Sequence, residues 1–232
     1  MLGCLLQVLA LAAVPARATS VYSYGKDEYV TLREGLAPNK QLSLAAHGGD
    51  ENGNGDPFHV WLMSEPAHLK IAVLPDIGGD KENILDSAAD AFRAVWSEES
   101  RRVAVLFRSS RQIFEFNLYR IDGRHVDEII RPDLFKEVTS RDASDGDDER
   151  KRIFGVEWRG GNRFVLREFR TFVISDPAFT RLLGKYGRIA EKLDDGKLFV
   201  QFAAEADCLV LPGGRTRVID LRPGDFEKPP IW

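Results

Sequence analysis

Short runs of alternating apolar and polar residues recur along most of the chain, with turn-forming residues between them. The clearest group spans residues 96–132. Its successive runs occupy 103–107, 114–118 and 126–130. Alternation with a period of two residues is typical of β-strands that bury one face. Residues 96–132 are therefore predicted to form three short antiparallel strands, with a turn at Asp122-Gly123 before the third.

Further strands are expected on both sides of this group. Apolar or alternating runs occupy 29–32, 42–45, 58–63, 71–74, 156–158, 164–174, 198–202, 208–211 and 217–221. Short helices are expected at 133–138 and at 177–184, where Asp176 would be the N-cap and Pro177 the first helical residue. The charged run 142–152 lacks apolar residues and is expected to be a solvated loop, with a partner-binding segment as the alternative. The chain is therefore predicted to be all-β, with a few short helices.

Parts of this pattern recur with offsets of fifty-seven to sixty residues. The matching pairs are 58–63 with 116–121, Lys40 with Ser100, and Pro75 with Pro132. Offsets this similar indicate internal duplication. Weaker matches around Trp158 and within 194–221 extend the pattern to about four repeat-like units.

Residues 96–105, WSEESRRVAV, resemble the WD40-like repeat of TolB-type β-propellers. In that repeat, polar turn residues close a tight hairpin, and a small residue such as Ala104 lets neighbouring strands pack closely. Degenerate copies lie at 37–40 and 194–197, and the resemblance covers residues 36–223. It implies β-propeller-like antiparallel repeats, arranged as a partial or small propeller or as a twisted sandwich. It also implies that the protein binds a protein, peptide or sugar, without naming the ligand.

Residues 1–18 have the composition of a signal peptide. An uncharged apolar run at 2–14 is followed by Ala-Arg-Ala at 16–18, a small-x-small cleavage site, so cleavage is expected before Thr19. The apolar run is shorter than the roughly 20 residues that a membrane-spanning helix needs. A buried N-terminal helix is the alternative. The favoured prediction is an exported protein, periplasmic or secreted, with no membrane span after cleavage.

The remaining chain is expected to hold one domain. A lead-in at 19–35 precedes a single β domain at 36–223, and a Pro-rich tail follows at 224–232. Cleavage would leave Cys208 as the remaining cysteine, so no internal disulfide is expected. Cys208 lies in an apolar run, which predicts a buried and unreactive thiol.

The net charge of −4 is too small to indicate binding to nucleic acid or to an anionic membrane. Arginines are clustered at 101–111 and at 159–170, where they could line a site for an anionic ligand. Acidic residues lie between them, which favours an ion-paired surface instead. The expected partner is therefore an unidentified protein or ligand of the envelope or the extracellular space.

The sharpest local motif is the polar segment at 50–56. Asp50, Asn52, Asn54 and Asp56 have the spacing of the first half of a calcium-binding loop, in which alternate oxygens surround the ion. Trp61 occupies the position where such a loop has its bidentate Glu. A polar hairpin loop is the alternative, and calcium is the one cofactor that the sequence suggests.

The common catalytic motifs are absent from the sequence, including the Gly-x-Ser-x-Gly elbow, His-Glu-x-x-His and the phosphate-binding loop. Three functions remain open. The first is a non-catalytic binding or interaction module of the cell envelope. The second is an exported hydrolase whose acidic residues converge from different repeat units, and the third is a calcium-stabilised structural domain.

Overall fold

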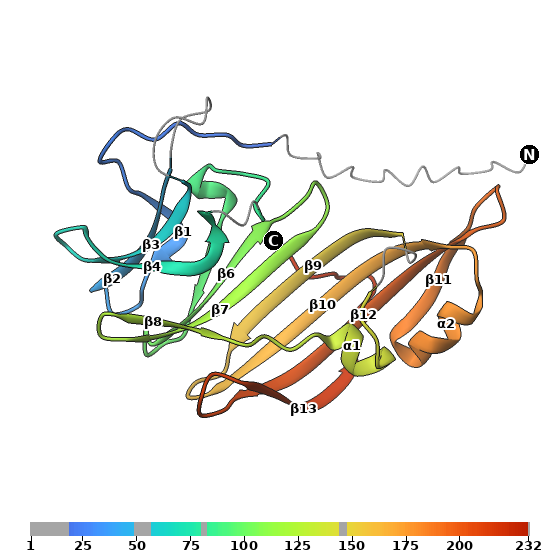
Figure 1. Cartoon of the computed structure of the whole chain (residues 1–232). Coiled ribbons are helices and arrows are strands. Elements are labelled where there is room, and N and C mark those ends of the chain that lie inside the picture. The colour runs from blue at the N-terminus through green and yellow to red at the C-terminus, as the bar shows by residue number, and fades with distance from the viewer. Residues whose placement is uncertain (1–18, 49–56, 80–82, 144–147, 232) are drawn as a thin grey trace, which may run out of the picture.

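The computed structural model of the chain describes residues 19–48, 57–79, 83–143 and 148–231. Most elements in this part are strands, which form two sheets, and the helices are short. Figure 1 shows the first sheet in blue to green and the second in yellow to red. The all-β class expected from the sequence is therefore confirmed.

In the described part of the chain, eight strands form the first sheet, in the order β4-β3-β2-β1-β5-β6-β7-β8. They are β1 (Val30–Leu36), β2 (Leu42–His47), β3 (His59–Ser64), β4 (Leu69–Gly78), β5 (Arg93–Trp96), β6 (Arg102–Arg108), β7 (Phe114–Asp122) and β8 (His125–Ile129). The sheet curves until its end strands, β4 and β8, come into contact. The hydroxyl of Tyr119 on β7 donates to the carbonyl of Pro75 on β4 at 2.6 Å. The sheet is therefore nearly closed.

Strands β1–β4 and β5–β8 each form an antiparallel meander. The meanders join through parallel pairing of β1 with β5, where Arg33 lies opposite Arg93. The turns before β2 and β6 have the same geometry. Lys40 has φ of 57° and Ser100 of 56°, and each donates its backbone N–H to the residue three positions earlier at 2.9 Å. The two meanders thus share strand order and turn conformation.

The two faces of β6 are both buried. Val103 and Val105 point into the curved first sheet, where they join an apolar cluster with Leu44 of β2. The residues between them, Ala104 and Leu106, point outward and are covered by the second sheet. The apolar character of β6 therefore follows from its place between two cores.

Five more strands in the described residues form the second sheet: β9 (Glu149–Trp158), β10 (Arg163–Ile174), β11 (Gly187–Lys192), β12 (Leu198–Val210) and β13 (Thr216–Pro223). Strand β12 pairs with β10 on one side, and on its other side first with β11 and then with β13. Helices α1 (Leu134–Thr139) and α2 (Ala178–Leu183) lie over one face of this sheet (Figure 1). Within the described residues, no helix has the length and apolar character needed to cross a membrane.

A shared core fills the space between the second sheet, the helices, and the outward face of β6 and β7. Phe172 on β10 has its ring centroid 5.5 Å from that of Phe135 on α1 and 5.0 Å from that of Phe179 on α2. Cys208 on β12 belongs to this core and is fully buried. The expected burial is therefore confirmed. Burial raises the pKa of the thiol to about 12, in keeping with the prediction of low reactivity.

The C-terminal tail crosses the face of the second sheet that points away from the helices. The backbone N–H of Gly224 donates to the carbonyl of Ala203 at 2.9 Å. Further on, Pro230 packs so closely on Gly155 that a Cβ there would lie 3.1 Å from the proline side chain. The Pro-rich segment therefore covers part of the sheet, as an extension of β13.

The strands differ from expectation in three places. Residues 198–202 and 208–211 belong to one long strand, β12, because the small Ala204 and Ala206 between them face the core without a strong apolar signal. Strand β11 was not expected, since it is an edge strand with mostly exposed side chains. The charged residues 149–152 are the start of β9 and not a solvated loop, because Glu149 and Arg152 form an ion pair that is largely buried.

Candidate functional site

A hollow of about 620 Å³ opens beside α2, where β10 ends. The chain leaves the strand through Ser175 and Asp176, and the Asp176 carboxylate accepts the backbone N–H of Ala178 at 2.8 Å. Helix α2 begins at Ala178 with Pro177 as its N-cap, one residue later than the sequence indicates. Phe179 and Leu183 then anchor the helix in the shared core. The hollow is thus bounded by elements that are fixed in place.

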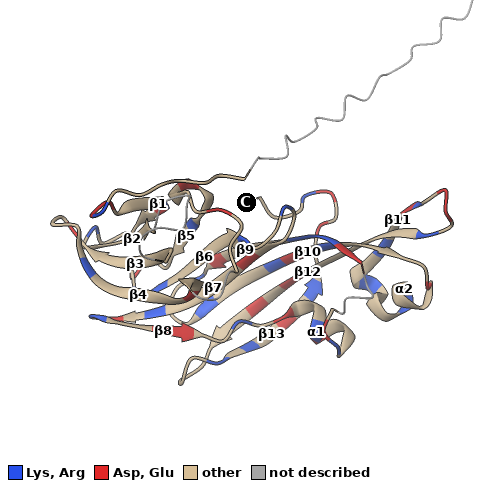
Figure 2. Cartoon of the chain, turned by 45° about the horizontal axis from the view of Figure 1, so that its top comes forward, with Lys and Arg blue, Asp and Glu red and all other residues tan. Residues whose placement is uncertain are grey.

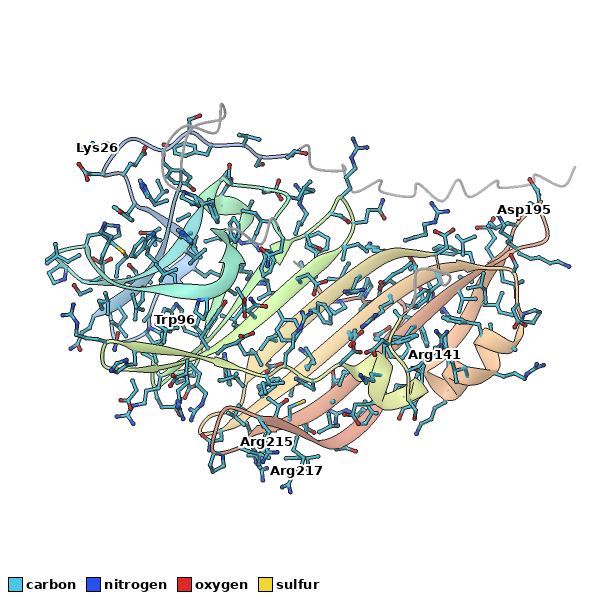
Figure 3. All side chains as sticks on the ribbon, viewed as in Figure 1. Lys26, Trp96, Arg141, Asp195, Arg215 and Arg217 are labelled. Atoms are coloured by element: carbon cyan, nitrogen blue, oxygen red, sulfur yellow. The ribbon has the colours of Figure 1, made fainter. Side chains whose placement is uncertain are left out.

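The wall of the hollow combines apolar side chains with charges of both signs. Its apolar residues are Val173, Ile174, Ala178, Phe179 and Leu182, and its charged residues are Arg141, Asp148, Asp176 and Lys197. The guanidinium of Arg141 lies over the ring of Phe179 at 5.4 Å, and Figure 3 shows this arginine beside α1. Ligand pockets typically have volumes of about 300–1,000 Å³ and a mainly apolar wall with a few polar groups. The volume of the hollow falls in this range, and its wall mixes apolar and charged side chains.

A second cluster of charges lies beside the shared core. This network, named here the buried ion network for its buried centre, consists of Glu115, Arg131, Asp133, Glu149, Arg152, Glu168 and Arg170, of which Arg131 and Asp133 lie at its exposed edge. Its centre is Glu168, whose side chain is 0% exposed and accepts hydrogen bonds from the Arg170 guanidinium and, at 3.1 Å, from the backbone N–H of Leu134. Burial raises the pKa of Glu168. A raised carboxyl pKa can indicate a catalytic acid when the group faces a cleft.

The partners of Glu168 indicate a structural role instead. Each of its two carboxylate oxygens accepts a hydrogen bond. Arg170 also pairs with Asp133 at 3.2 Å, and Asp133 accepts the backbone N–H of Lys136 as the N-cap of α1. The guanidinium of Arg170 lies 4.9 Å from the ring centroid of Phe135. The network therefore fastens the first turn of α1 to the second sheet.

A serine, a glutamate and a histidine also meet on the first sheet. Ser43 donates its hydroxyl to Glu65 at 2.6 Å, and Nδ1 of His68 lies 2.7 Å from the same Glu65 oxygen. Nε2 of His68 lies 3.0 Å from the carbonyl of Tyr29. Both ring nitrogens thus face acceptors, an arrangement that suits the protonated imidazolium. Such a ring cannot accept a proton from Ser43, so this trio is not a nucleophile–base pair.

The trio predicts a pH dependence of stability. The hydrogen bond to Glu65 raises the pKa of His68 above 6.5, although burial opposes the shift. The resulting stabilisation is complete below about pH 6.5 and is lost as the pH rises through the higher folded-state pKa. In urea unfolding, the destabilisation caused by His68→Gln is therefore expected to shrink from about pH 6 to about pH 9. His125→Gln, at an exposed position on β8, is the control; a His68→Gln effect that is the same at both pH values would contradict the imidazolium assignment.

Arginines of the cluster at 159–170 form ion pairs across the second sheet. Arg167 pairs with Glu205 at 2.5 Å and with Glu157 at 3.0 Å, and Arg159 pairs with Glu157 at 3.0 Å. Arg222 on β13 continues this row of charges by pairing with the same Glu205 at 2.6 Å. Figure 2 shows blue and red segments on neighbouring strands of the second sheet. For these residues the ion-paired alternative is confirmed.

The expected calcium ligands Asp50, Asn52, Asn54 and Asp56 lie outside the described residues. Among the residues that the structure describes, no group of His, Cys, Asp and Glu is arranged to hold a metal ion. Thermal unfolding in calcium and in chelator tests the expectation directly, and equal melting temperatures would contradict it.

The residues that line the hollow were not indicated by the sequence. Arg141, Asp176 and Lys197 come from three connections that lie far apart along the chain. Lys197 lies in the degenerate repeat copy 194–197, and no motif links it to Arg141 or Asp176. The available signal was the expected helix start at Asp176. It locates one border of the hollow, but it does not indicate that charged side chains line the hollow.

Comparisons of this chain with models of protein families, with curated proteins and with solved structures give no match.

Proposed function

We propose that the protein is an exported, non-catalytic binding module of the cell envelope, and that it holds its partner at the hollow beside α2. The observation that carries this proposal is the hollow itself, about 620 Å³ in volume and walled by apolar side chains between charged groups. An apolar wall of this kind gives affinity, and a few fixed polar groups give orientation. The two positive and two negative side chains suit a polypeptide segment, which carries both charges and apolar groups.

The architecture supports a binding role in a second way. The β1–β4 and β5–β8 meanders share their strand order, and Lys40 and Ser100 hold the same turn conformation. We infer that they descend from one duplicated unit, in keeping with the resemblance of residues 96–105 to a WD40-like repeat. Units of that kind supply a rigid β scaffold, and binding sites then form on the loops and ends that the scaffold positions.

Position-specific crosslinking in intact cells tests the binding proposal. A photoreactive residue placed at Leu182, which lines the hollow and is 39% exposed, is expected to give one discrete crosslinked product. The same residue at Leu69, which is 62% exposed on β4, is the matched control and is expected to give background only. Adding Arg141→Glu to the Leu182 variant should remove the product, because the charge at the border of the hollow is reversed. Equal products from both positions, or a product unaffected by Arg141→Glu, would contradict the proposal.

An exported hydrolase is the second candidate, because two carboxylates line the same hollow. Asp148 precedes β9 and Asp176 precedes α2, so the acids do come from different parts of the chain. Each carboxylate already has a partner, since Asp148 binds Arg150 at 2.6 Å and Asp176 accepts the backbone N–H of Ala178 at 2.8 Å. Binding is therefore favoured. Turnover of ester, glycoside or peptide substrates that disappears in Asp148→Asn and in Asp176→Asn would support the hydrolase instead.

A further inference from the structure

A second hollow, of about 370 Å³, opens on the face of the second sheet that points away from the helices, named here the outer face. It lies where β10 begins at Arg163, whereas the hollow beside α2 lies where β10 ends at Ile174. Two apolar side chains contribute to its wall, since Val165 is 2% exposed and Ile219 is 49% exposed. The second hollow therefore has an apolar wall of its own, at the opposite end of β10 from the proposed binding site.

A β-bulge shapes the wall that β13 contributes. Asp207 lies opposite Asp220 where β12 pairs with β13, and the next residue of β12, Cys208, lies opposite Val218. Ile219 is thus an extra residue without a partner on β12. A bulge of this kind changes the direction of the side chains beside it. Ile219 lines the second hollow, while its neighbour Val218 packs against the shared core. The hollow is therefore formed by the strands themselves.

Three arginines form a row across this end of the outer face. Arg163 on β10 and Arg217 on β13 both lie opposite Leu209 of β12. Arg159, just beyond the end of β9, donates its backbone N–H to the carbonyl of Arg163 at 2.9 Å and so extends the row. Residues that lie opposite each other in neighbouring strands have their side chains on one face of the sheet. Arg159 and Arg163 line the second hollow, and Figure 3 shows Arg217 at the border of the sheet.

The acidic residues near the second hollow are already engaged. Each of them pairs with Arg159, Arg167 or Arg222, and they are Glu157, Glu205, Asp207 and Asp220. Within the part of the chain that the structure describes, the exposed side chains of Arg163 and Arg217 have no ion pair or hydrogen bond. The two guanidinium groups that flank Leu209 therefore carry positive charge that the described chain does not neutralise.

These two guanidinium groups can reach the same ligand. Arg163 and Arg217 are separated by one strand, β12, so their backbones lie roughly 10 Å apart. Two arginine side chains are long enough to meet over Leu209 across this distance. Guanidinium groups bind the oxygens of phosphate and carboxylate groups in a bidentate manner. A phosphate monoester carries about 1.5 to 2 negative charges at pH 7, so it matches two unpaired arginines better than a carboxylate does.

We propose that this end of the outer face is a second binding site, which takes a phosphate monoester with a small apolar part. Arg163 and Arg217 bind the phosphate group, and the apolar part lies against Val165 and Ile219 in the second hollow. Arg159 contributes a third guanidinium group, which it shares with Glu157. The site is separate from the hollow beside α2 and does not depend on the partner proposed there.

Calorimetric titration of the purified full chain with phenyl phosphate tests this proposal. The parent is expected to bind phenyl phosphate with a dissociation constant of about 1 mM or lower. Arg163→Gln and Arg217→Gln are each expected to weaken binding roughly tenfold or more, because each removes a charge-assisted hydrogen bond. Arg181→Gln, which removes an exposed arginine on α2, is the matched control and should bind as the parent does. No binding by the parent, or equal binding by all three variants, would overturn the proposal.

Two further titrations test the chemistry of the ligand. Benzoate has the same ring with a single negative charge, and it is expected to bind the parent roughly tenfold more weakly than phenyl phosphate. Ile219→Glu places a carboxylate in the second hollow at a half-exposed position, so it should remove the binding of phenyl phosphate and keep the melting temperature of the parent. Benzoate that binds as tightly as phenyl phosphate would refute the phosphate assignment. An Ile219→Glu variant that binds phenyl phosphate as the parent does would refute the place of the ring.

Discussion

Replacing Arg170 with alanine is expected to lower the free energy of unfolding by about 3–5 kcal/mol. The change leaves the fully buried carboxylate of Glu168 without its charged partner, and it removes the contact of the guanidinium with Phe135 and its ion pair with Asp133. Leaving one member of a buried ion pair unpaired is among the largest single-residue effects known in proteins. Urea unfolding followed by tryptophan fluorescence measures the loss.

The control for Arg170→Ala is Arg120→Ala. Arg120 pairs with Asp127 at 2.7 Å, but the two side chains are 45% and 52% exposed, so a loss of about 0–1 kcal/mol is expected. The double replacement Glu168→Leu with Arg170→Met removes both charges and is expected to recover much of the stability lost in Arg170→Ala. If Arg170→Ala were as mild as Arg120→Ala, the network would not fasten α1 in the way described.

Replacing Phe172 with alanine is expected to cost about 3–5 kcal/mol of the free energy of unfolding. Phe172 is fully buried, and its ring contacts Phe135 of α1 and Phe179 of α2. The cavity would thus open where both helices meet the second sheet. Urea unfolding gives the loss, and weaker near-ultraviolet circular dichroism would report the loosened aromatic cluster.

The matched control for Phe172→Ala is Ile189→Ala on β11. Ile189 is 51% exposed, so its truncation should change the free energy of unfolding by no more than about 0.5 kcal/mol. Phe172→Ala would contradict the described packing if it cost less than about 1 kcal/mol. The hollow beside α2 depends on this packing, because Phe179 belongs both to its wall and to the core.

Strands with alternating or continuous apolar residues could be predicted from the sequence. The residue-to-residue correspondence between the two meanders could not. The ladders pair Leu44 with Leu62 in the first meander and Ala104 with Leu118 in the second. With Lys40 equivalent to Ser100, Leu118 therefore corresponds to Leu62, two residues away from the match made on the sequence. In both alignments, side chains inside the first sheet, such as Leu62, fall on side chains of the shared core outside it, such as Leu118. The apolar pattern consequently does not fix the correspondence.

The candidate site was less predictable than the fold. Its charged residues lie in connections, where no periodicity links them, and only the folded chain brings Arg141 near Lys197. The buried ion network was missed for a related reason. Glu168 and Arg170 have the sequence appearance of ordinary polar strand residues, yet they lie on the same face of β10 as the buried Leu166 and Phe172. Only the position of α1 over this face makes a buried charge pair possible.

The central place of β12 has a consequence for the order in which the chain acquires its structure. Strand β12 pairs with β10, β11 and β13, so the second sheet cannot be completed before residues 198–210 are present. The chain is synthesised from its N-terminus, and the meander β5–β8 therefore exists first. Until β12 arrives, the outward side chains of Ala104, Leu106, Phe116 and Leu118 lack part of the core that covers them. A nascent chain halted at this stage would present an apolar surface suited to chaperones and prone to aggregation.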